Sequence, residues 1–278
     1  MPPLLGDCVM ALPFINSVKN FYRLEIISSQ SNHWFLKVLL SRHFVSEQKN
    51  YFGYADKAVD FLSDKNSADF LNRIKPRISV GFPDGAYPYD LHLKMPAEYA
   101  ACQASEIFLY ALDLLHISRS EFVDFSISKK WEQGAQKNIA ILPRIGSGNR
   151  FFSPETYLHL AENIQQNIAE VTFLLGPQER ELKNKIGNNF LSEICIDFGE
   201  TLQRLQHFRM AVAGEGGMMH VAASLGIPLL GLLGKTSAKN WFPYQNPNQV
   251  YFRNENGVLN KSDSVEIIKL CKEIYELQ

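Results

Sequence analysis

The sequence predicts an α/β protein with parallel strands and covering helices. In the second half, short apolar runs typical of strands alternate with segments whose apolar residues recur at helical spacing. The connections are short, and glycine-containing turns stand at strand-to-helix junctions. This alternation is typical of a parallel sheet with helices on both faces. We count about five strands, the size of one mononucleotide-binding domain.

The elements of the second half follow one another along the chain. An apolar run over 138–143 predicts a strand, and Ser153 and Pro154 then begin a helix as its N-cap and first residue. The apolar residues of this helix lie on one face as far as Ile164. Asp263 is expected to cap the last helix. Further strands are expected at 171–175, 193–196, 210–213, 227–233 and 250–252, and further helices at 179–186, 201–208, 218–225 and 263–277.

The first half has weaker patterns. Residues 84–96 contain Pro, Tyr and Gly and are expected to form a loop. Residues 2–7 have the composition of a loop that normally follows a strand, so this half is expected to lack its first strand. Helices are expected at 8–20, 34–40, 55–62, 67–74 and 97–115, and strands at 24–28, 43–45 and 78–80.

Composition excludes several classes of protein. Of the 278 residues, 46% are apolar and 21% are charged, which is typical of a folded protein rather than a disordered one. Lys and Arg number 28 against 29 Asp and Glu, and neither half has a basic surplus. A chain without a basic surplus is not expected to bind nucleic acid as its main ligand.

The four cysteines lack the spacing of a zinc site, a redox CxxC pair or a disulfide scaffold. No basic segment followed by an apolar one marks a signal peptide at the N-terminus. The longest apolar stretch, 218–234, is too short and too interrupted to span a bilayer. We therefore expect a reduced, cytoplasmic protein.

Three glycine-containing turns are candidate ligand sites. They are Gly6-Asp7, Gly146-Ser147-Gly148 and the segment from Gly214 to Gly217. Ligands of parallel sheets bind at the carboxyl ends of strands, where helix N-termini offer N–H groups to phosphate. Arg150 adds a permanent positive charge to the second turn. Any one of these glycines could be present only because its turn is tight. The turns could therefore form a phosphate site or have a purely structural role, and both interpretations stay open.

Other motifs limit the chemistry. The sequence has no dinucleotide fingerprint, no P-loop and no Asp-x-Asp, so a diphosphate chelated through a metal by paired carboxylates is not expected. His220 lies one turn into a helix and could contact a polar ligand or be structural. Glu179 follows a strand end, where it could accept hydrogen bonds from ribose or simply stabilise its helix.

Residues 213–228 resemble a stretch of glycosyltransferase family 9, the heptosyltransferase family of bacterial lipopolysaccharide synthesis. The family pattern is Asp-Ser/Thr-Gly-x-x-His-x-Ala-x-x-x-Gly-x-Pro, and this chain has Glu-Gly-Gly-Met-Met-His-Val-Ala-Ala-Ser-Leu-Gly-Ile-Pro. The resemblance continues through Gly234-Lys-Thr236 and Trp241-Phe-Pro243. It is strong from about 139 to 243, where the loop 146–154 and the strand end 175–180 also resemble family motifs. Leu5-Gly-Asp7, with Pro13 after it, resembles the family's N-terminal loop.

The resemblance implies a GT-B fold, in which two Rossmann-like domains face each other across a cleft. Residues 1–130 would form the acceptor-side domain. Residues 131–278 would bind the nucleotide sugar, with the last helix able to return to the first domain. The implied activity is a metal-independent, inverting transfer with no cofactor, from a nucleotide-diphospho-sugar such as ADP-heptose to a lipid-linked saccharide. The implied location is the cytoplasm, where the enzyme could touch the inner membrane peripherally.

The resemblance also implies roles for individual residues. Asp7 would be the general base on the acceptor hydroxyl, and Arg150 would stabilise charge on the leaving diphosphate. Glu179 would face the ribose. The remaining donor-binding residues would be Ser147, Gly148, Glu215, Gly216, Gly217, Met218 and His220.

One departure from the family pattern bears on the donor site. Glu215-Gly216 stands where the family has Asp-Ser/Thr, so one hydroxyl contact is lost and the carboxylate lies one carbon further out. This fits either a changed donor or a decayed site. Two other interpretations therefore stay open: a non-catalytic family member that binds a sugar nucleotide or glycan, and an unrelated α/β enzyme such as a sugar-nucleotide epimerase.

Overall fold

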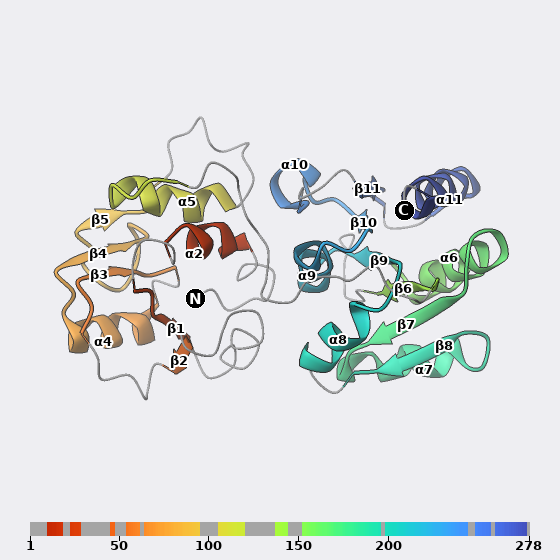
Figure 1. Cartoon of the computed structure of the whole chain (residues 1–278), viewed down its shortest axis with the longest axis horizontal. Helices are drawn as coiled ribbons and strands as arrows, with labels where there is room; N and C mark the ends of the chain where they lie inside the picture. The colour runs from red at the N-terminus through yellow and green to blue at the C-terminus, as the bar shows by residue number, and fades with distance from the viewer. Residues whose placement is uncertain are drawn as a thin grey trace. The chain divides into compact units, whose positions relative to one another are not determined.

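Two units, Met1–Ser128 and Lys129–Gln278, make up the chain in the computed structural model. Figure 1 shows the elements of each unit. The structure describes residues 10–18, 23–28, 45–47, 54–61, 64–94, 105–119, 137–143, 152–195, 198–243, 248–256 and 259–276.

The second unit is built on a six-stranded parallel sheet, and its strands overlap the six ranges that the sequence predicts from 138–143 to 250–252. Its strand order is β11-β10-β9-β6-β7-β8. The middle strands are continuous apolar runs because helices cover both faces of the sheet. The strands are β6 (Ile139–Leu142), β7 (Val171–Leu175), β8 (Leu191–Ile194), β9 (Met210–Gly214), β10 (Leu229–Leu233) and β11 (Gln249–Arg253).

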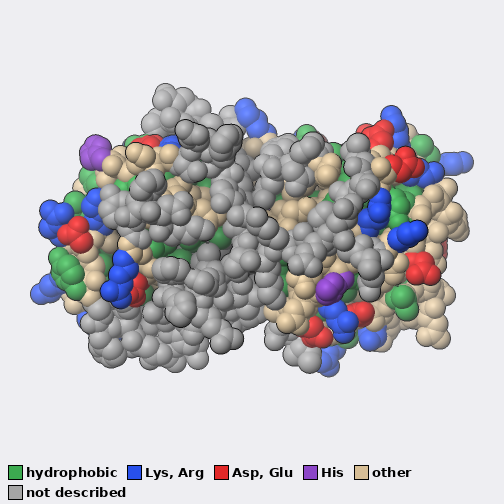
Figure 2. Space-filling view, in the orientation of Figure 1, with side chains coloured by type: hydrophobic (Ala, Val, Ile, Leu, Met, Phe, Trp, Pro, Cys, Tyr) green, Lys and Arg blue, Asp and Glu red, His purple; other side chains and the backbone are tan. Residues whose placement is uncertain are grey.

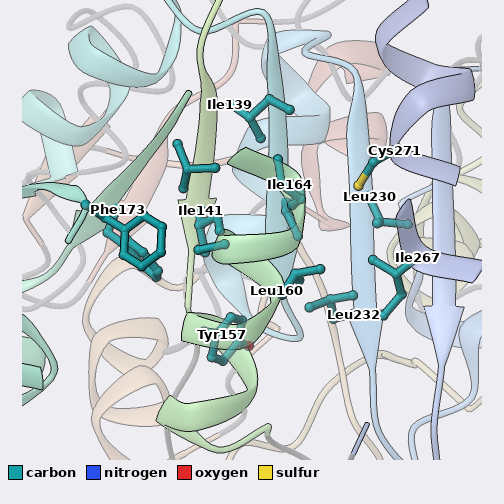
Figure 3. Close-up of a cluster of buried hydrophobic side chains, with 14 of the residues drawn as sticks. Ile139, Ile141, Tyr157, Leu160, Ile164, Phe173, Leu230, Leu232, Ile267 and Cys271 are labelled. Carbon is teal, nitrogen blue, oxygen red and sulfur yellow. The ribbon is translucent and has the colours of Figure 1, made fainter. Parts of the chain in front are cut away.

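The helices of this unit form two layers. Side chains of α6, α7 and α11 join a core with one face of the sheet, where Ile141, Leu230 and Ile267 are fully buried. Figure 3 shows this cluster between the strands and two of these helices. In Figure 1, α8 and α9 lie on the opposite side of the sheet. The helices are α6 (Pro154–Asn167), α7 (Arg180–Ile186), α8 (Phe198–Leu205), α9 (Gly217–Leu225), α10 (Ala238–Trp241) and α11 (Lys261–Glu276), with a short 3₁₀ turn, η4 (Pro177–Glu179), before α7.

Helix caps explain where α6 and α11 begin. Ser153 accepts a hydrogen bond from the Thr156 N–H at 3.2 Å, which confirms it as the N-cap of α6. The expectation that Asp263 is the N-cap of α11 is wrong. Asn260 accepts from the Asp263 N–H at 3.0 Å, while the Asp263 carboxylate accepts from the Asn260 N–H at 2.9 Å. The helix thus begins two residues earlier, because Asn260 and Asp263 cap it reciprocally.

The far end of α11 is tied to the sheet. The Arg209 guanidinium stacks over the Tyr275 ring at 4.5 Å and donates to the Tyr275 carbonyl at 2.9 Å. The Tyr275 hydroxyl donates to the Lys137 carbonyl at 2.8 Å, just before β6 begins. Among the described elements, α11 packs on α6, β10 and β11 of its own unit.

The first unit has two small parallel sheets. One pairs β1 (Ile26–Ser28) with β2 (Val45–Glu47), and the other has the order β3-β4-β5. The helices expected at 67–74 and 97–115 overlap α4 and α5. The remaining elements are β3 (Lys57–Val59), β4 (Ile78–Gly81), β5 (Leu91–His92), α2 (Leu12–Val18), α4 (Lys65–Ile74) and α5 (Ser105–Leu114).

Two predictions for the first unit are wrong. The helix expected at 55–62 is instead the strand β3, which pairs in parallel with β4 from Lys57↔Ile78 to Val59↔Val80. The loop expected at 84–96 contains the two-residue strand β5. Both strands are too short for a periodic pattern, so pairing with β4 decides their conformation. The predicted helix at 34–40 and the expected absence of a first strand concern residues outside the described ones.

Replacing Gly231 with alanine should destabilise the second unit by about 1–3 kcal/mol, because the added methyl group overpacks the core. A Cβ at this position of β10 would lie 2.6 Å from the Phe242 ring and 3.0 Å from the Met219 sulfur. Urea unfolding would measure the change. Gly176→Ala is the matched control, since its Cβ would meet only a Glu179 oxygen at 3.7 Å. Equal unfolding free energies for the two variants would contradict the prediction.

Candidate active site

The strand order predicts where a ligand-binding crevice lies in the second unit. The chain moves outward from β6 through β7 to β8, and then returns to β9 on the other side of β6. Open parallel sheets bind ligands at this reversal, outside the carboxyl ends of the two central strands. Because β6 pairs with β9 up to Leu142↔Ala213, the segments that follow these strands leave the sheet at the same edge. The candidate site therefore lies beyond Leu142 and Gly214.

The turn after β9 leads directly into α9. The strand ends at Gly214 and the helix begins at Gly217, so only two residues separate them. The first turn of a helix has N–H groups that the helix itself does not bond, and its dipole favours negative charge there. The N-terminal residues of α9, Gly217 and Met218, are partly exposed at this end. This end of α9 is suited to an anion such as a phosphate group.

Glu215 lies in this turn and is fixed by two hydrogen bonds to β10 and the segment after it. Its N–H donates to the Leu232 carbonyl at 3.0 Å, and its Oε1 accepts from the Thr236 hydroxyl at 2.7 Å. Only 7% of Glu215 is exposed. A buried carboxylate therefore stands at the edge of the crevice, next to the N-terminus of α9.

His220 lies in the first turns of α9 and is only 5% exposed. Burial lowers the pKa of its imidazole to about 4, so the ring is neutral near pH 7. Among the described residues, no group forms a hydrogen bond with its Nδ1 atom. The structure thus makes His220 a neutral, buried polar group in the helix that borders the crevice.

Glu179 follows β7, which is the neighbour of β6 on the other side of the crevice. Its Oε2 accepts a hydrogen bond from the Gly176 N–H at 2.8 Å and closes the 3₁₀ turn. The structural role that the sequence left open for Glu179 is therefore present. The side chain is only partly buried, at the same edge of the sheet as Glu215.

Comparison with known proteins identifies the family. The profile of glycosyltransferase family 9 (heptosyltransferase) matches residues 81–270, which is more than half of the chain. The chain belongs to glycosyltransferase family 9. The profile spans the whole candidate site from β6 to β10. The search of curated protein sequences found no match to this chain.

Solved structures of glycosyltransferases share the fold of this family member. A family 9 glycosyl transferase from Veillonella parvula has a TM-score of 0.77 at 12% identity, covering 99% of this chain and 95% of that one. E. coli heptosyltransferase WaaC with ADP has a TM-score of 0.75 at 14% identity, covering 97% of each chain. E. coli ADP-heptose lps heptosyltransferase II has a TM-score of 0.76 at 14% identity, with 99% and 97% covered. At such low identity these matches show the fold, which is the GT-B fold expected from the resemblance.

The structure brings together part of the predicted site. Glu215, Gly216, Gly217, Met218 and His220 all lie in the β9–α9 turn and the first turns of α9, and Glu179 lies after β7 at the same edge. The remaining predicted site residues, Asp7, Ser147, Gly148 and Arg150, are outside the described part of the chain.

Thr236 contacts the site, although it was not among the predicted site residues. The sequence signal for it was present, since Gly234-Lys-Thr236 is part of the family resemblance. Its contact with Glu215 joins residues 21 positions apart, and depends on β9 and β10 being neighbours in the sheet.

Surface charge and composition of the described residues add three findings. On the visible face in Figure 2, Lys and Arg side chains are interspersed with Asp and Glu rather than gathered in one basic area. Within the described ranges, no group of three or more His, Cys, Asp or Glu side chains could hold a metal ion. None of the helices described is long and apolar enough to cross a membrane.

Proposed function

We propose that this member of glycosyltransferase family 9 transfers heptose from ADP-heptose to a lipid-linked saccharide acceptor of the lipopolysaccharide core. The observation that carries the proposal is the β9–α9 turn at the strand-order reversal, where a helix N-terminus and a buried carboxylate stand side by side. The helix N-terminus suits a diphosphate, and the carboxylate suits the hydroxyl groups of a sugar. WaaC, whose fold this chain shares, has been solved with ADP and with an ADP-heptose analogue.

In this proposal, the donor lies along the carboxyl edge of the second unit's sheet. The N–H groups of Gly217 and Met218 bind the diphosphate, and Ser147 and Arg150 from the segment after β6 complete the anion site. Gly216 and Gly148 leave room for the phosphates, and Glu179 accepts hydrogen bonds from the ribose. His220 contributes a neutral imidazole ring beside the turn.

The proposed reaction is a single displacement at the anomeric carbon. An acceptor hydroxyl oxygen forms the new bond on one face of the sugar, while the bond to the diphosphate oxygen breaks on the other, which inverts the configuration. Asp7 takes the proton of the hydroxyl as the new bond forms. ADP leaves with the bonding electron pair, and Arg150 stabilises the charge that develops on it. The proposal needs no metal, in keeping with a sequence that has no Asp-x-Asp.

The experiment that tests the function is acceptor-dependent release of ADP from ADP-heptose in the presence of EDTA. Release is expected only when a heptose-deficient lipopolysaccharide core acceptor is also present, with mass spectrometry showing one added heptose. The anomeric configuration of the product, read by NMR, should be opposite to that of the donor. A rate that EDTA abolishes would contradict the metal-independent step.

A second candidate function is donor binding without transfer, and the Glu215-Gly216 departure favours it. It predicts that ADP-heptose binds in calorimetry while no acceptor is glycosylated. A change in the donor sugar without any acceptor would instead favour an epimerase. Together, donor binding, glycosylation of the acceptor and change of the donor sugar without acceptor separate the three interpretations.

A further inference from the structure

The contact between Thr236 and Glu215 joins the segments that follow two neighbouring strands. β9 and β10 pair in parallel up to Gly214↔Leu232, and the Glu215 N–H extends this ladder by one residue. Beyond the end of β10, the Thr236 hydroxyl donates to Glu215 Oε1 at 2.7 Å. The contact therefore lies at the carboxyl edge of the sheet, where the crevice is.

The segment that carries Thr236 is anchored on both sides. Before it, the Arg253 guanidinium of β11 donates to the Lys235 carbonyl at 3.2 Å. After it, the Phe242 ring is fully buried and packs closely against Gly231 of β10. A hydroxyl held in this way gives the carboxylate that it contacts one preferred orientation.

This orientation matters more for glutamate than for aspartate. Glutamate has one more side-chain torsion than the aspartate of the family pattern, and fixing a free side chain on ligand binding costs conformational entropy. A hydrogen bond that fixes the torsion before the ligand arrives removes part of this cost. Thr236 thus compensates for the longer side chain at position 215.

We propose that Thr236 is a positioning residue that orients the Glu215 carboxylate toward the hydroxyl groups of the donor's sugar. This inference rests on the proposed function. The carboxylate oxygen that accepts from Thr236 suits the hydroxyl groups of a sugar, which donate hydrogen bonds, and not the oxygens of a diphosphate, which are acceptors themselves. The sugar, rather than the ADP part of the donor, is the group recognised through this contact. Thr236 therefore determines how strongly the enzyme distinguishes a nucleotide sugar from the nucleotide alone.

The test compares ADP-heptose with ADP in calorimetric binding to Thr236→Val and Thr236→Ser. Valine has the shape of threonine without its hydroxyl, and is expected to lower ADP-heptose affinity about three- to tenfold, the cost of ordering one side chain when the ligand binds. ADP affinity should stay within about twofold of wild type, because ADP carries no sugar at that position. Serine restores the hydroxyl and should rescue ADP-heptose binding. Thr156→Val, on α6, is the matched control.

A second variant keeps the inference testable if Thr236→Val fails to fold. Glu215→Gln removes the charge with little change of shape, and should likewise weaken ADP-heptose but not ADP. Equal losses for both ligands, or no loss for either, would overturn the role of Thr236. A wild-type protein that binds ADP-heptose no more tightly than ADP would overturn it too. If the wild type binds ADP but Thr236→Val keeps its full affinity for ADP-heptose, only this inference fails. If the wild type binds neither ADP nor ADP-heptose, the proposed function itself is refuted.

Discussion

Replacing Asp7 with asparagine is expected to slow heptose transfer by about 10²–10⁴-fold while leaving the affinity for ADP unchanged. A sugar hydroxyl is a poor nucleophile near neutral pH, and the proposed mechanism requires a carboxylate to take its proton as the new bond forms. Asparagine keeps the size of the side chain but cannot accept this proton. Single-turnover rates with saturating donor would measure the effect on the chemical step.

Asp69→Asn is a suitable control for Asp7→Asn. Asp69 is an exposed aspartate of α4 in the same unit, and its replacement should leave the transfer rate unchanged. A transfer rate for Asp7→Asn within tenfold of wild type would contradict the general-base role. Loss of ADP binding in the same variant would show that Asp7 acts on the fold instead.

Acidification is expected to destabilise the second unit by up to about 3 kcal/mol through His220 alone. Burial lowers the folded-state pKa of this histidine from 6.5 to about 4. Between these values the unfolded chain binds the proton more readily than the folded one. The contribution of His220 to stability is therefore complete above pH 6.5 and is lost as the pH falls toward 4.

Urea unfolding at pH 7 and at pH 4.5 would measure this loss. His220→Asn keeps a polar side chain but removes the titrating group, so its unfolding free energy should fall less with acidification than that of wild type. His207 lies at an exposed position after α8, and the unfolding free energy of His207→Asn should fall with acidification as much as that of wild type. The same pH dependence in wild type and His220→Asn would contradict the assignment.

The second unit could be predicted well because its four central strands, β10, β9, β6 and β7, are fully buried. β7 is expected at 171–175 and has those bounds, since four apolar residues and the β-branched Thr172, bounded by Glu170 and Gly176-Pro177, leave little choice of conformation. Ser153-Pro154 marked the start of α6 for a similarly local reason. The two edge strands are less clear in the sequence, because β8 and β11 are partly exposed and their patterns are weaker.

The first unit and parts of the site could not be predicted because they depend on contacts between distant residues. β3 has three half-buried residues and becomes a strand only by pairing with β4. A histidine at a helix start could equally be exposed, and only the covered position of α9 makes His220 neutral. The Thr236–Glu215 contact requires the neighbouring positions of β9 and β10, which no local pattern specifies. The β9–α9 turn, by contrast, could be placed in advance because its glycines and its family pattern are contiguous.

The position of α11 has a consequence for the synthesis of the protein. This helix supplies Ile267, Cys271 and Ile274 to the core of the second unit, and Tyr275 ties its end to Arg209 and Lys137. The ribosome makes α11 after every strand that it covers, so apolar side chains such as Leu230 remain uncovered until it emerges. Nascent chains with uncovered apolar surface are prone to aggregate and are the substrates of chaperones. Covering of this face of the sheet is therefore a late event in the synthesis of each chain.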